Sequence, residues 1–379
     1  MGGGPVTVAL CGDVMLGRGI DQILPHPGDP ALREGGMADA RGYVALAEAA
    51  HGPLPALPVG FDWPWGEALA VLDAAAPAAR IVNLETGVTL SGDFAPGKAV
   101  HYRMHPRNVP CLAAVRPDVC VLANNHVMDF GRRGLRETLR VLAGAGLRTA
   151  GAGRDAGAAG RAAAVPLGGG RRVTVLAFGM PSSGIPPEWA ATGRRAGVAY
   201  VDTPGGPAAR ALARRVREEK RPGDIAVVSV HWGSNWGYGV PDGRAAFARA
   251  LVDAGADVVH GHSSHHTRPL ELYRGKLILH GCGDFVDDYE GIGGYERYRD
   301  DLRPLYLAAL DPETGRLESL RITVFRPLAL RLYRAPAEDA AWLRELLERT
   351  GRGLRTAGAG EGGGAGEGGD PASWTFVPV

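Results

Sequence analysis

Histidine, carboxylate and amide side chains recur in this chain directly after short apolar runs. The residues in such positions that could do chemistry are Asp13, Glu85, Asn124, Asn125, His126, His231, His260, His262, His265, His266 and Asp284. Four of the histidines lie between positions 260 and 266, and transition-metal ligation explains this clustering better than four unrelated core or surface residues do. Mixed carboxylate, imidazole and amide ligands suit manganese, iron or zinc, so the pattern predicts a metal-assisted hydrolase.

The densest mixture of amide and imidazole groups lies in the segment Leu122–Gly131. The apolar run Val119–Ala123 is typical of a buried parallel strand, and it delivers Asn124, Asn125 and His126 at its carboxyl end. Ligands bind at that end of the strands in an open α/β sheet. An amide oxygen is a neutral metal ligand, and a neighbouring histidine can supply or accept a proton. For the Asn-His pair alone, an Asn-rich helix cap is an equally good interpretation.

Two earlier strand ends carry a carboxylate each. The run Val6–Leu10 leads to Asp13, and the run beginning at Arg80 leads to Glu85. Such a carboxylate commonly presents a metal ligand or a catalytic acid, and the alternative is an Asp that caps a turn. Arg18 follows Asp13 by five residues. We expect Arg18 either to hold an anionic group of the substrate through two parallel hydrogen bonds or to pair with Asp21 on the surface.

The elements that position these residues alternate between strand-like and helix-like patterns, which is typical of an α/β fold. Further apolar strands are expected at 173–178, 224–231, 257–262 and 276–280, helices at 67–76 and 135–142, and a terminal antiparallel pair at 305–310 and 320–325 followed by a helix over 338–350. Residues 21–66 lack clear periodicity and are rich in Pro and Gly. We interpret them as an irregular insertion that helps to wall the site.

Composition places the chain among globular proteins. It has 379 residues, 42 Lys and Arg against 41 Asp and Glu, and a hydrophobic fraction of 45%. Length alone would allow two or three domains. We predict one domain over 1–355, with a motif-bearing core at 6–290 and C-terminal strands and a helix at 300–350, followed by a flexible Gly-rich tail over 356–379. The balanced charge gives no indication of a nucleic-acid partner.

The cysteines and the chain start bear on the cellular compartment. The cysteines Cys11, Cys111, Cys120 and Cys282 are far apart and show no CxxC spacing, so small buried residues are expected rather than a disulfide framework. The first residues lack the basic and apolar regions of a signal peptide, and no apolar run reaches 18 residues. We therefore expect a cytoplasmic protein without a membrane segment. The sequence does not determine an oligomeric state.

Taken together, six motifs resemble the CapA family of poly-γ-glutamate capsule synthesis proteins, which belongs to the calcineurin-like metallophosphoesterase superfamily. They are Gly12-Asp13, Asn83-Leu-Glu85, Asn124-Asn-His126, His231-Trp-Gly233, Gly261-His262-x-x-His265 and Gly281-x-Gly-Asp284-Phe285. The resemblance implies a four-layer α/β sandwich of metallophosphoesterase type, with a dinuclear metal site at the carboxyl ends of the strands. It also implies that Asp13, Glu85, Asn125, His231 and His262 are metal ligands, that His265 is a further ligand or lies beside the metals, and that His126 is the proton donor.

The chain also departs from the pattern of the superfamily. Met15 stands where typical metallophosphoesterases have a second early ligand, a histidine, so one metal site is expected to be weak or absent. Asn235 and Trp236 follow the His231 motif where an acidic and then an aromatic residue are usual. Asp284 replaces the customary Asn of a Gly-Asn-Phe motif. These changes affect the expected substrate more than the expected metal chemistry.

Two function hypotheses follow. In the first, a soluble hydrolase with two divalent transition metal ions, manganese, iron or zinc, cleaves an amide bond, for example a γ-glutamyl bond, or a phosphoester bond. A metal-activated hydroxide would be the nucleophile, His126 would protonate the leaving group, and the substrate would be an anionic small molecule or peptide-like compound. In the second hypothesis, the protein is a non-catalytic accessory in the synthesis of poly-γ-glutamate or a related polymer, and its metal site is vestigial.

Overall fold

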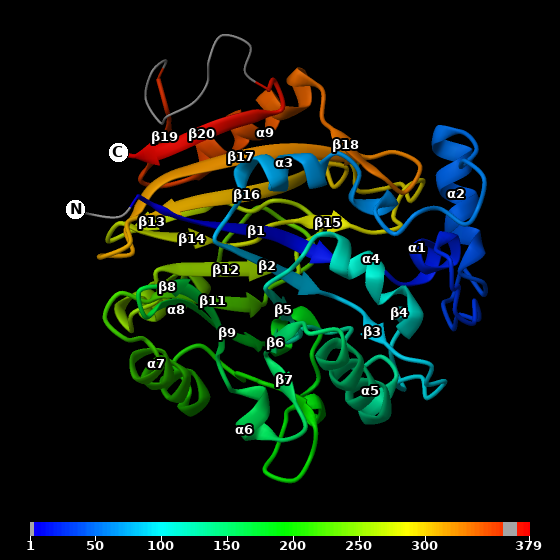
Figure 1. Cartoon of the computed structure of the whole chain (residues 1–379), viewed down its shortest axis with the longest axis horizontal. Helices are drawn as coiled ribbons and strands as arrows, with labels where there is room; N and C mark the ends of the chain where they lie inside the picture. Colours follow the sequence, from blue (N-terminus) through cyan, green and yellow to red (C-terminus); the bar gives the residue numbers. More distant parts are fainter. Residues whose placement is uncertain (1–3, 359–369) are drawn as a thin grey trace.

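Two β-sheets packed face to face form the middle of the structure, a computed structural model that describes residues 4–358 and 370–379 (Figure 1). The first sheet follows the order β19-β20-β17-β16-β1-β2-β5-β6, with β15 paired to β1 and β18 paired to β17. Its strands are β1 (Val6–Val14), β2 (Ala79–Leu84), β5 (Val119–Val121), β6 (Arg148–Ala150), β15 (Asp284–Val286), β16 (Arg303–Leu310), β17 (Leu317–Pro327), β18 (Leu332–Arg334), β19 (Leu354–Thr356) and β20 (Ser373–Pro378).

The second sheet follows the order β13-β14-β12-β11-β9-β8. Its strands are β8 (Ala163–Gly168), β9 (Arg171–Gly179), β11 (Ile225–His231), β12 (Val258–His262), β13 (Leu270–Tyr273) and β14 (Lys276–Leu279). Strands β9, β11, β12 and β14 are parallel, as are β1, β2, β5 and β6 in the first sheet. Their apolar sequences suit strands that are covered on both faces. Each parallel set brings its carboxyl ends to one edge.

Helices cover the outer faces of both sheets. The first sheet is covered by α3 (Ala68–Ala75), α4 (Val109–Ala114) and α5 (Gly131–Gly144), and the second by α7 (Pro207–Glu219) and α8 (Asp242–Asp253). Between the sheets, alternate residues of facing strands share one core, for example Val8 of β1 and Val227 of β11. The predicted four-layer α/β sandwich is thus confirmed. All four cysteines are buried and free, as expected for small core residues.

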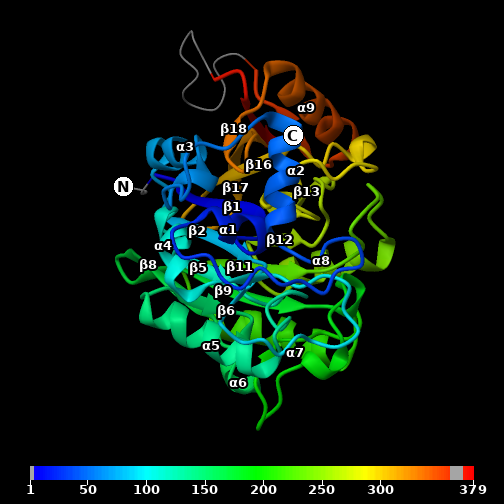
Figure 2. The ribbon, with the colours of Figure 1, turned by 90° about the vertical axis from the view of Figure 1, so that its right-hand side faces the viewer.

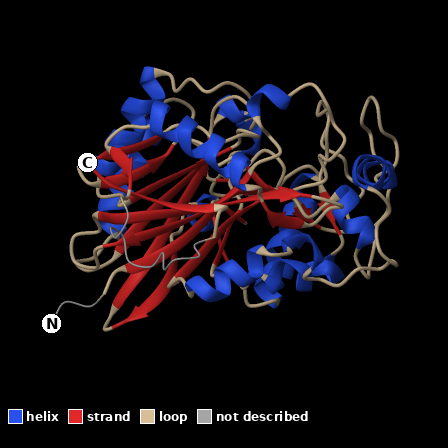
Figure 3. Cartoon of the chain, turned by 90° about the horizontal axis from the view of Figure 1, so that it is seen from above, coloured by secondary structure: helices blue, strands red, loops and turns tan. Residues whose placement is uncertain are grey.

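The remaining elements lie around this sandwich. They are α1 (Arg18–Ile23), α2 (Arg41–His51), α6 (Ala156–Ala159), α9 (Ala337–Thr350) and two short strand pairs, β3 (Gly87–Val88) with β4 (Arg103–Met104) and β7 (Ala152–Gly153) with β10 (Gly197–Val198). Figure 2 shows α9 above the sheets and α5 to α7 below them, and Figure 3 shows helices above and below the strands. Among the described residues, no helix combines the length and the apolar character that crossing a bilayer requires.

The C-terminal part of the chain corrects one prediction and confirms another. Strands β16 and β17 form the expected antiparallel pair. However, the end of the predicted flexible tail is ordered, because Ser373–Pro378 forms β20 between β17 and β19. Trp374 and Phe376 of this strand are buried in the core between the sheets, and that burial holds it in place. Residues 359–369 of the predicted tail lie outside the described residues.

Candidate metal centre

The strand ends of both sheets meet where the sequence predicts metal ligands. Asp13 lies near the end of β1, Glu85 directly follows β2, and His231 and His262 are the last residues of β11 and β12. Two groups have ligand atoms within 4.8 Å of one another: Asp13 with Glu85 and Asp284, and Asp13 with His231 and His262. All five residues are buried, and Asp13 belongs to both groups.

A close approach of two backbone segments brings Asp284 to this cluster. In the parallel pairing of β1 with β15, Asp13 is the partner of Asp284. The preceding Gly12 lies so close to Gly283 that a Cβ atom at position 12 would lie 1.7 Å from the Gly283 carbonyl oxygen. Only glycine permits this contact. Asp284, whose role the sequence left open, is therefore a member of the carboxylate group.

The carboxylates are crowded and far from water. Asp13 accepts hydrogen bonds from Asn83 Nδ2 at 2.6 Å and from the Ser263 backbone N–H at 3.1 Å. Burial, and then the Asp284 charge, raise the pKa of Asp13 to about 7, and burial together with Asp13 and Asp284 raises the pKa of Glu85 well above its ordinary value. A divalent cation would offset this repulsion, so the donor set fits a metal site.

The imidazole side of the cluster is electrically neutral. His231 Nδ1 lies 2.7 Å from His262 Nδ1, and His231 Nε2 lies 2.8 Å from Asn125 Oδ1 and 3.5 Å from Glu85 Oε1. Burial lowers the pKa of both histidines well below the ordinary value. Metal ligation requires this neutral form. The structure thus brings Asn125 together with the predicted ligands of both sheets.

His265 lies beside the carboxylates. Its Nδ1 is 3.1 Å from both Asp284 carboxylate oxygens, and its Nε2 is 3.1 Å from Asn235 Nδ2. Burial opposes a charge on this ring, but the Asp284 carboxylate outweighs that effect and raises the pKa of His265. Both ring nitrogens therefore have protein partners. That His265 is a further ligand or lies beside the metals stays a prediction.

His126 is held at the edge of the cluster by residues that the sequence did not identify. Its Nδ1 lies 2.6 Å from Asp129 Oδ2, and its Nε2 lies 4.0 Å from Glu85 Oε1. Lys98 forms an ion pair with Asp129, and Tyr102 stacks on the imidazole at 3.8 Å between centroids. Burial lowers the pKa of His126 to about 4. The spacing of three residues from His126 could have indicated Asp129, whereas Lys98 gave no local signal.

Arg18 lies in a buried ion-pair network. Its Nε donates to Asp288 at 3.2 Å, its Nη1 lies 3.2 Å from a Glu34 oxygen, and its guanidinium stacks over the Tyr43 ring at 3.8 Å. Asp21, the alternative partner, accepts hydrogen bonds from other donors: the backbone N–H groups at positions 28 and 105 and the side-chain amide at 108. The predicted contact between Arg18 and the substrate stays a prediction.

Three residues with open roles have structural partners. Asn124 Oδ1 accepts from the backbone N–H groups of His126 at 3.1 Å and Val127 at 2.9 Å, so Asn124 fixes the turn after β5. His266 Nδ1 is 3.0 Å from the Thr267 carbonyl oxygen. The sulfur of Met15 is buried and lies 3.2 Å from the Gly17 backbone nitrogen. These contacts account for Asn124 and Met15 without a role as metal ligands, whereas His266 Nε2 is buried without a hydrogen-bond partner among the described residues.

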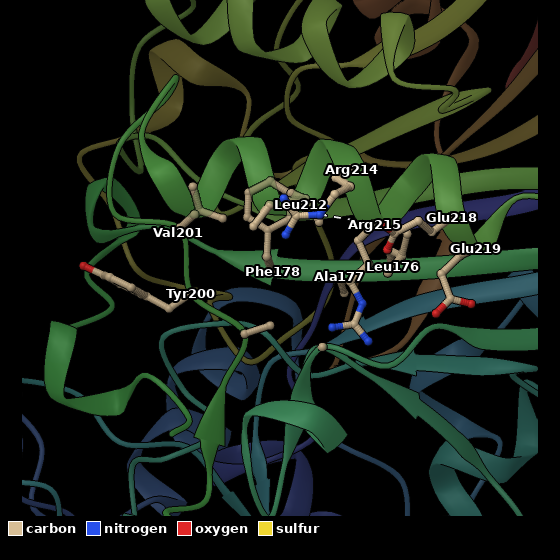
Figure 4. A pocket seen from close by; sticks show the side chains of 14 residues that line it. Leu176, Ala177, Phe178, Tyr200, Val201, Leu212, Arg214, Arg215, Glu218 and Glu219 are labelled. Carbon is tan, nitrogen blue, oxygen red and sulfur yellow. Dashed lines mark ion pairs between the residues drawn. The ribbon is translucent and has the colours of Figure 1, made fainter. Parts of the chain in front are cut away.

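Two surface cavities lie apart from the predicted ligands. One, of about 380 Å³, lies between β9 and α7 and is lined by Phe178, Leu212 and Arg215 among others (Figure 4). The other, of about 400 Å³, is lined by residues that include Tyr289 and Arg303. Neither lining, as drawn from the described residues, includes a predicted metal ligand. The candidate centre is identified here by its side-chain chemistry.

Comparison with known proteins agrees with the motifs. Residues 7–289 match the model of the family described as bacterial capsule synthesis protein PGA_cap. Probable polyglutamine synthesis accessory proteins from two strains of Mycobacterium tuberculosis are each 57% identical over 355 residues, which is 93% of this chain and 93% of theirs. The PGA biosynthesis protein CapA of Bacillus subtilis is 29% identical over 265 residues, covering 70% of this chain and 66% of its own.

Among solved structures, a 5'-nucleotidase precursor from Thermus thermophilus aligns with 84% of this chain and 54% of its own at 13% identity, with a TM-score of 0.41. A likeness this loose carries no functional argument. The family match covers most of the chain and includes every predicted ligand. The resemblance to CapA proteins is confirmed, and the chain belongs to the bacterial capsule synthesis protein PGA_cap family.

Proposed function

We propose that this protein is a metal-dependent hydrolase that cleaves an amide bond, for example a γ-glutamyl bond, or a phosphoester bond of an anionic, peptide-like or small-molecule substrate. The observation that carries the proposal is the placement of His126. Its Nε2 lies 4.0 Å from Glu85 of the metal cluster, and its Nδ1 is held by Asp129. A metal site with a purely structural role has no need of such a histidine at its edge.

The residues that would hold two divalent ions of manganese, iron or zinc are Asp13, Glu85, Asn125, His231 and His262, with His265 and Asp284 adjacent. When bound, such ions would supply a hydroxide nucleophile at neutral pH and would polarise the bond to be cleaved. Oxygen donors dominate around Glu85, and nitrogen donors dominate around His262. The two halves of the cluster therefore offer different ligand chemistry.

Residues of this chain would hold and transfer the proton that the leaving group needs. Asp129 Oδ2 accepts the Nδ1–H of His126, so Nε2 is the nitrogen that can take up a proton and pass it to a leaving group, and the Asp129 carboxylate opposes the burial that lowers the pKa of this ring to about 4. Tyr102 stacks on the imidazole and its backbone N–H donates to Asp129 at 2.7 Å. These contacts fix the direction of Nε2 before a substrate binds.

The names of the relatives favour a second candidate. The M. tuberculosis proteins, 57% identical to this chain, are described as accessory proteins of polyglutamine synthesis. By analogy, this protein would assist the synthesis of a glutamate-type polymer without catalysing a reaction. Both candidates agree with a role in polymer synthesis and with the cytoplasm as the proposed location, which cell fractionation would test.

Metal content and activity together discriminate the candidates. The protein would be purified after growth with added manganese, iron or zinc, and then assayed on a panel of γ-glutamyl amides, peptides and phosphoesters. The hydrolase proposal expects bound metal and a turnover that His126→Asn abolishes while metal is retained. Less than one metal equivalent per chain, or metal without turnover on any panel member, would favour the accessory role.

A further inference from the structure

Two neighbouring strands of the second sheet carry matching polar pairs on one face. In the parallel register of β11 with β12, Ser229 is the partner of His260 and His231 is the partner of His262. Residues two apart on a strand point to the same face, so all four side chains point toward the first sheet. All four are at most 1% exposed. Polar groups this deeply buried need defined hydrogen-bond partners.

These partners form a continuous chain that ends at a predicted metal ligand. His260 Nε2 lies 2.8 Å from the Cys11 carbonyl oxygen of the first sheet. His260 Nδ1 lies 3.0 Å from Ser229 Oγ, and Ser229 Oγ lies 2.9 Å from His262 Nε2. The remaining nitrogen, His262 Nδ1, faces His231 Nδ1 at 2.7 Å and Asp13 Oδ1 at 3.8 Å.

The carbonyl at the start of the chain dictates the proton positions from His260 to His262 Nε2, and the contact between the Nδ1 atoms of His262 and His231 lies beyond this range. A carbonyl oxygen only accepts, so His260 Nε2 must carry hydrogen. The opposite tautomer would set two lone pairs against each other at 2.8 Å. A doubly protonated His260 would bury a charge whose ring contacts are a carbonyl and a hydroxyl, without a carboxylate, which is costly. His260 is therefore neutral, and its Nδ1 accepts a hydrogen bond from Ser229.

The direction of the remaining hydrogen bond follows. The Ser229 hydroxyl donates its hydrogen to His260, so its oxygen must accept from His262. His262 Nε2 then carries hydrogen, and the lone pair of His262 lies on Nδ1.

We infer that Ser229 and His260 are positioning residues that fix His262 in the Nε2–H tautomer and present its Nδ1 lone pair to the metal cluster beside Asp13. The inference rests on the metal centre of the proposed function. It assigns a purpose to His260, which the sequence left open, and to a serine that no motif singled out. Outer partners of this kind set ring orientation and basicity in metal sites.

The same chain of hydrogen bonds connects the two sheets beside the candidate metal centre. The Cys11 carbonyl belongs to β1, two residues before Asp13, whereas His262 belongs to β12. The pairing of β1 with β2 shifts register between Leu10 and Asp13, next to this carbonyl. The contact from His260 therefore holds the β12 ligand in a fixed relation to the β1 ligand, which lies in the other sheet.

Nuclear magnetic resonance of the metal-stripped full chain tests the tautomer directly. In protein labelled with ¹⁵N-histidine, two-bond ¹H–¹⁵N correlations distinguish the two neutral tautomers, and the spectrum of His262→Gln identifies the His262 signals. We expect His262 in the Nε2–H form, and we expect Ser229→Ala to lose this preference. A wild-type His262 in the Nδ1–H form would overturn the inference, whether or not the protein binds metal.

Calorimetric titration with Mn²⁺ or Zn²⁺ measures the consequence. Loss of an outer partner typically weakens metal binding by about 10- to 100-fold, which we expect for Ser229→Ala, with recovery in Ser229→Thr, which keeps the hydroxyl. Thr174→Val is the matched control, because it removes a buried hydroxyl from the adjacent strand β9 that donates only to the Ile225 carbonyl. Equal affinities in wild type and Ser229→Ala would contradict the inference.

These experiments distinguish a failure of the metal-dependent hydrolase proposal from a failure of the positioning role of Ser229 and His260. If the wild-type chain binds neither ion, the metal-dependent hydrolase proposal fails, and the tautomer of His262 in the metal-free spectrum still decides the hydrogen-bond chain. If the wild-type chain binds metal and Ser229→Ala binds it equally well, the hydrolase proposal stands and the positioning role falls.

Discussion

Replacing Asp129 with Asn would separate the support of His126 from metal binding. Asp129 is fully buried and accepts from three donors: Lys98, His126 Nδ1 at 2.6 Å and the Tyr102 backbone N–H at 2.7 Å. An Asn at this position keeps one acceptor oxygen and turns an N–H₂ group toward the other donors. The side chain of Lys98, which is 18% exposed, then loses its counter-charge.

Removal of one partner from a buried ion pair costs about 3 to 5 kcal/mol. Because Lys98 keeps some contact with water, we expect the lower end, a loss of about 3 kcal/mol in the free energy of unfolding, measured by urea denaturation. Asp129→Asn should also lower turnover by about 10²- to 10⁴-fold at unchanged metal content, because His126 loses the partner that orients it.

The double variant Asp129→Asn with Lys98→Met is the matched control. It removes both charges, so the free energy of unfolding should recover by at least about 1 kcal/mol relative to Asp129→Asn alone. Turnover should not recover, because His126 still lacks its carboxylate. An unfolding free energy of Asp129→Asn within about 0.5 kcal/mol of wild type would refute the reasoning.

The remaining predictions concern metal, proton transfer, pH and substrate. Asp13→Ala and His231→Ala should each lower bound metal markedly with unchanged circular dichroism, and full occupancy in both would contradict the ligand assignment. His126→Asn should keep the metal and lose turnover by about 10²- to 10⁴-fold, whereas a loss of metal equal to that in Asp13→Ala would make it a ligand. Burial raises the pKa of Asp21 from 3.8 to about 6 despite its hydrogen bonds, so the folded state binds this proton more tightly than the unfolded state does. Stability should therefore fall by about 2 kcal/mol between pH 4 and pH 6, and urea denaturation of Asp21→Asn should show a correspondingly flatter pH dependence. Arg18→Lys should raise KM or lower kcat/KM at constant metal content, and unchanged kinetics would remove Arg18 from the substrate site.

The sequence could predict the buried strands and their ends because those signals are local. An apolar run followed by a polar side chain indicates a buried strand and its end, and parallel pairing then brings such ends together. The joining of Asp13 with Glu85 follows from this rule, and so does that of His231 with His262, whereas the meeting of the two pairs depends on the packing of one sheet on the other. The number of layers came from the family resemblance, and the order of the strands was not predicted.

Contacts between distant segments could not be predicted in the same way. Arg18 pairs with Asp288, 270 residues later in the chain, and no pattern near Arg18 indicates that partner. Asp284 joins the carboxylates only because two glycine backbones approach closely. The last strand had a local signal, the alternation around Trp374 and Phe376, but the preceding Gly-rich stretch led to its interpretation as a tail.

The choice between the catalytic and accessory hypotheses depends on residues that are not predicted metal ligands. Metal ligands alone would be compatible with either hypothesis, since a bound ion can stabilise a fold without doing chemistry. His126 differs, because its Nδ1 is committed to Asp129 while its Nε2 faces Glu85 at 4.0 Å. Lys98, whose side chain is 18% exposed, adds a cation that pairs with the fully buried Asp129. An acid–base group needs such orientation and a structural ion does not, and this difference is the physical basis on which we propose hydrolysis.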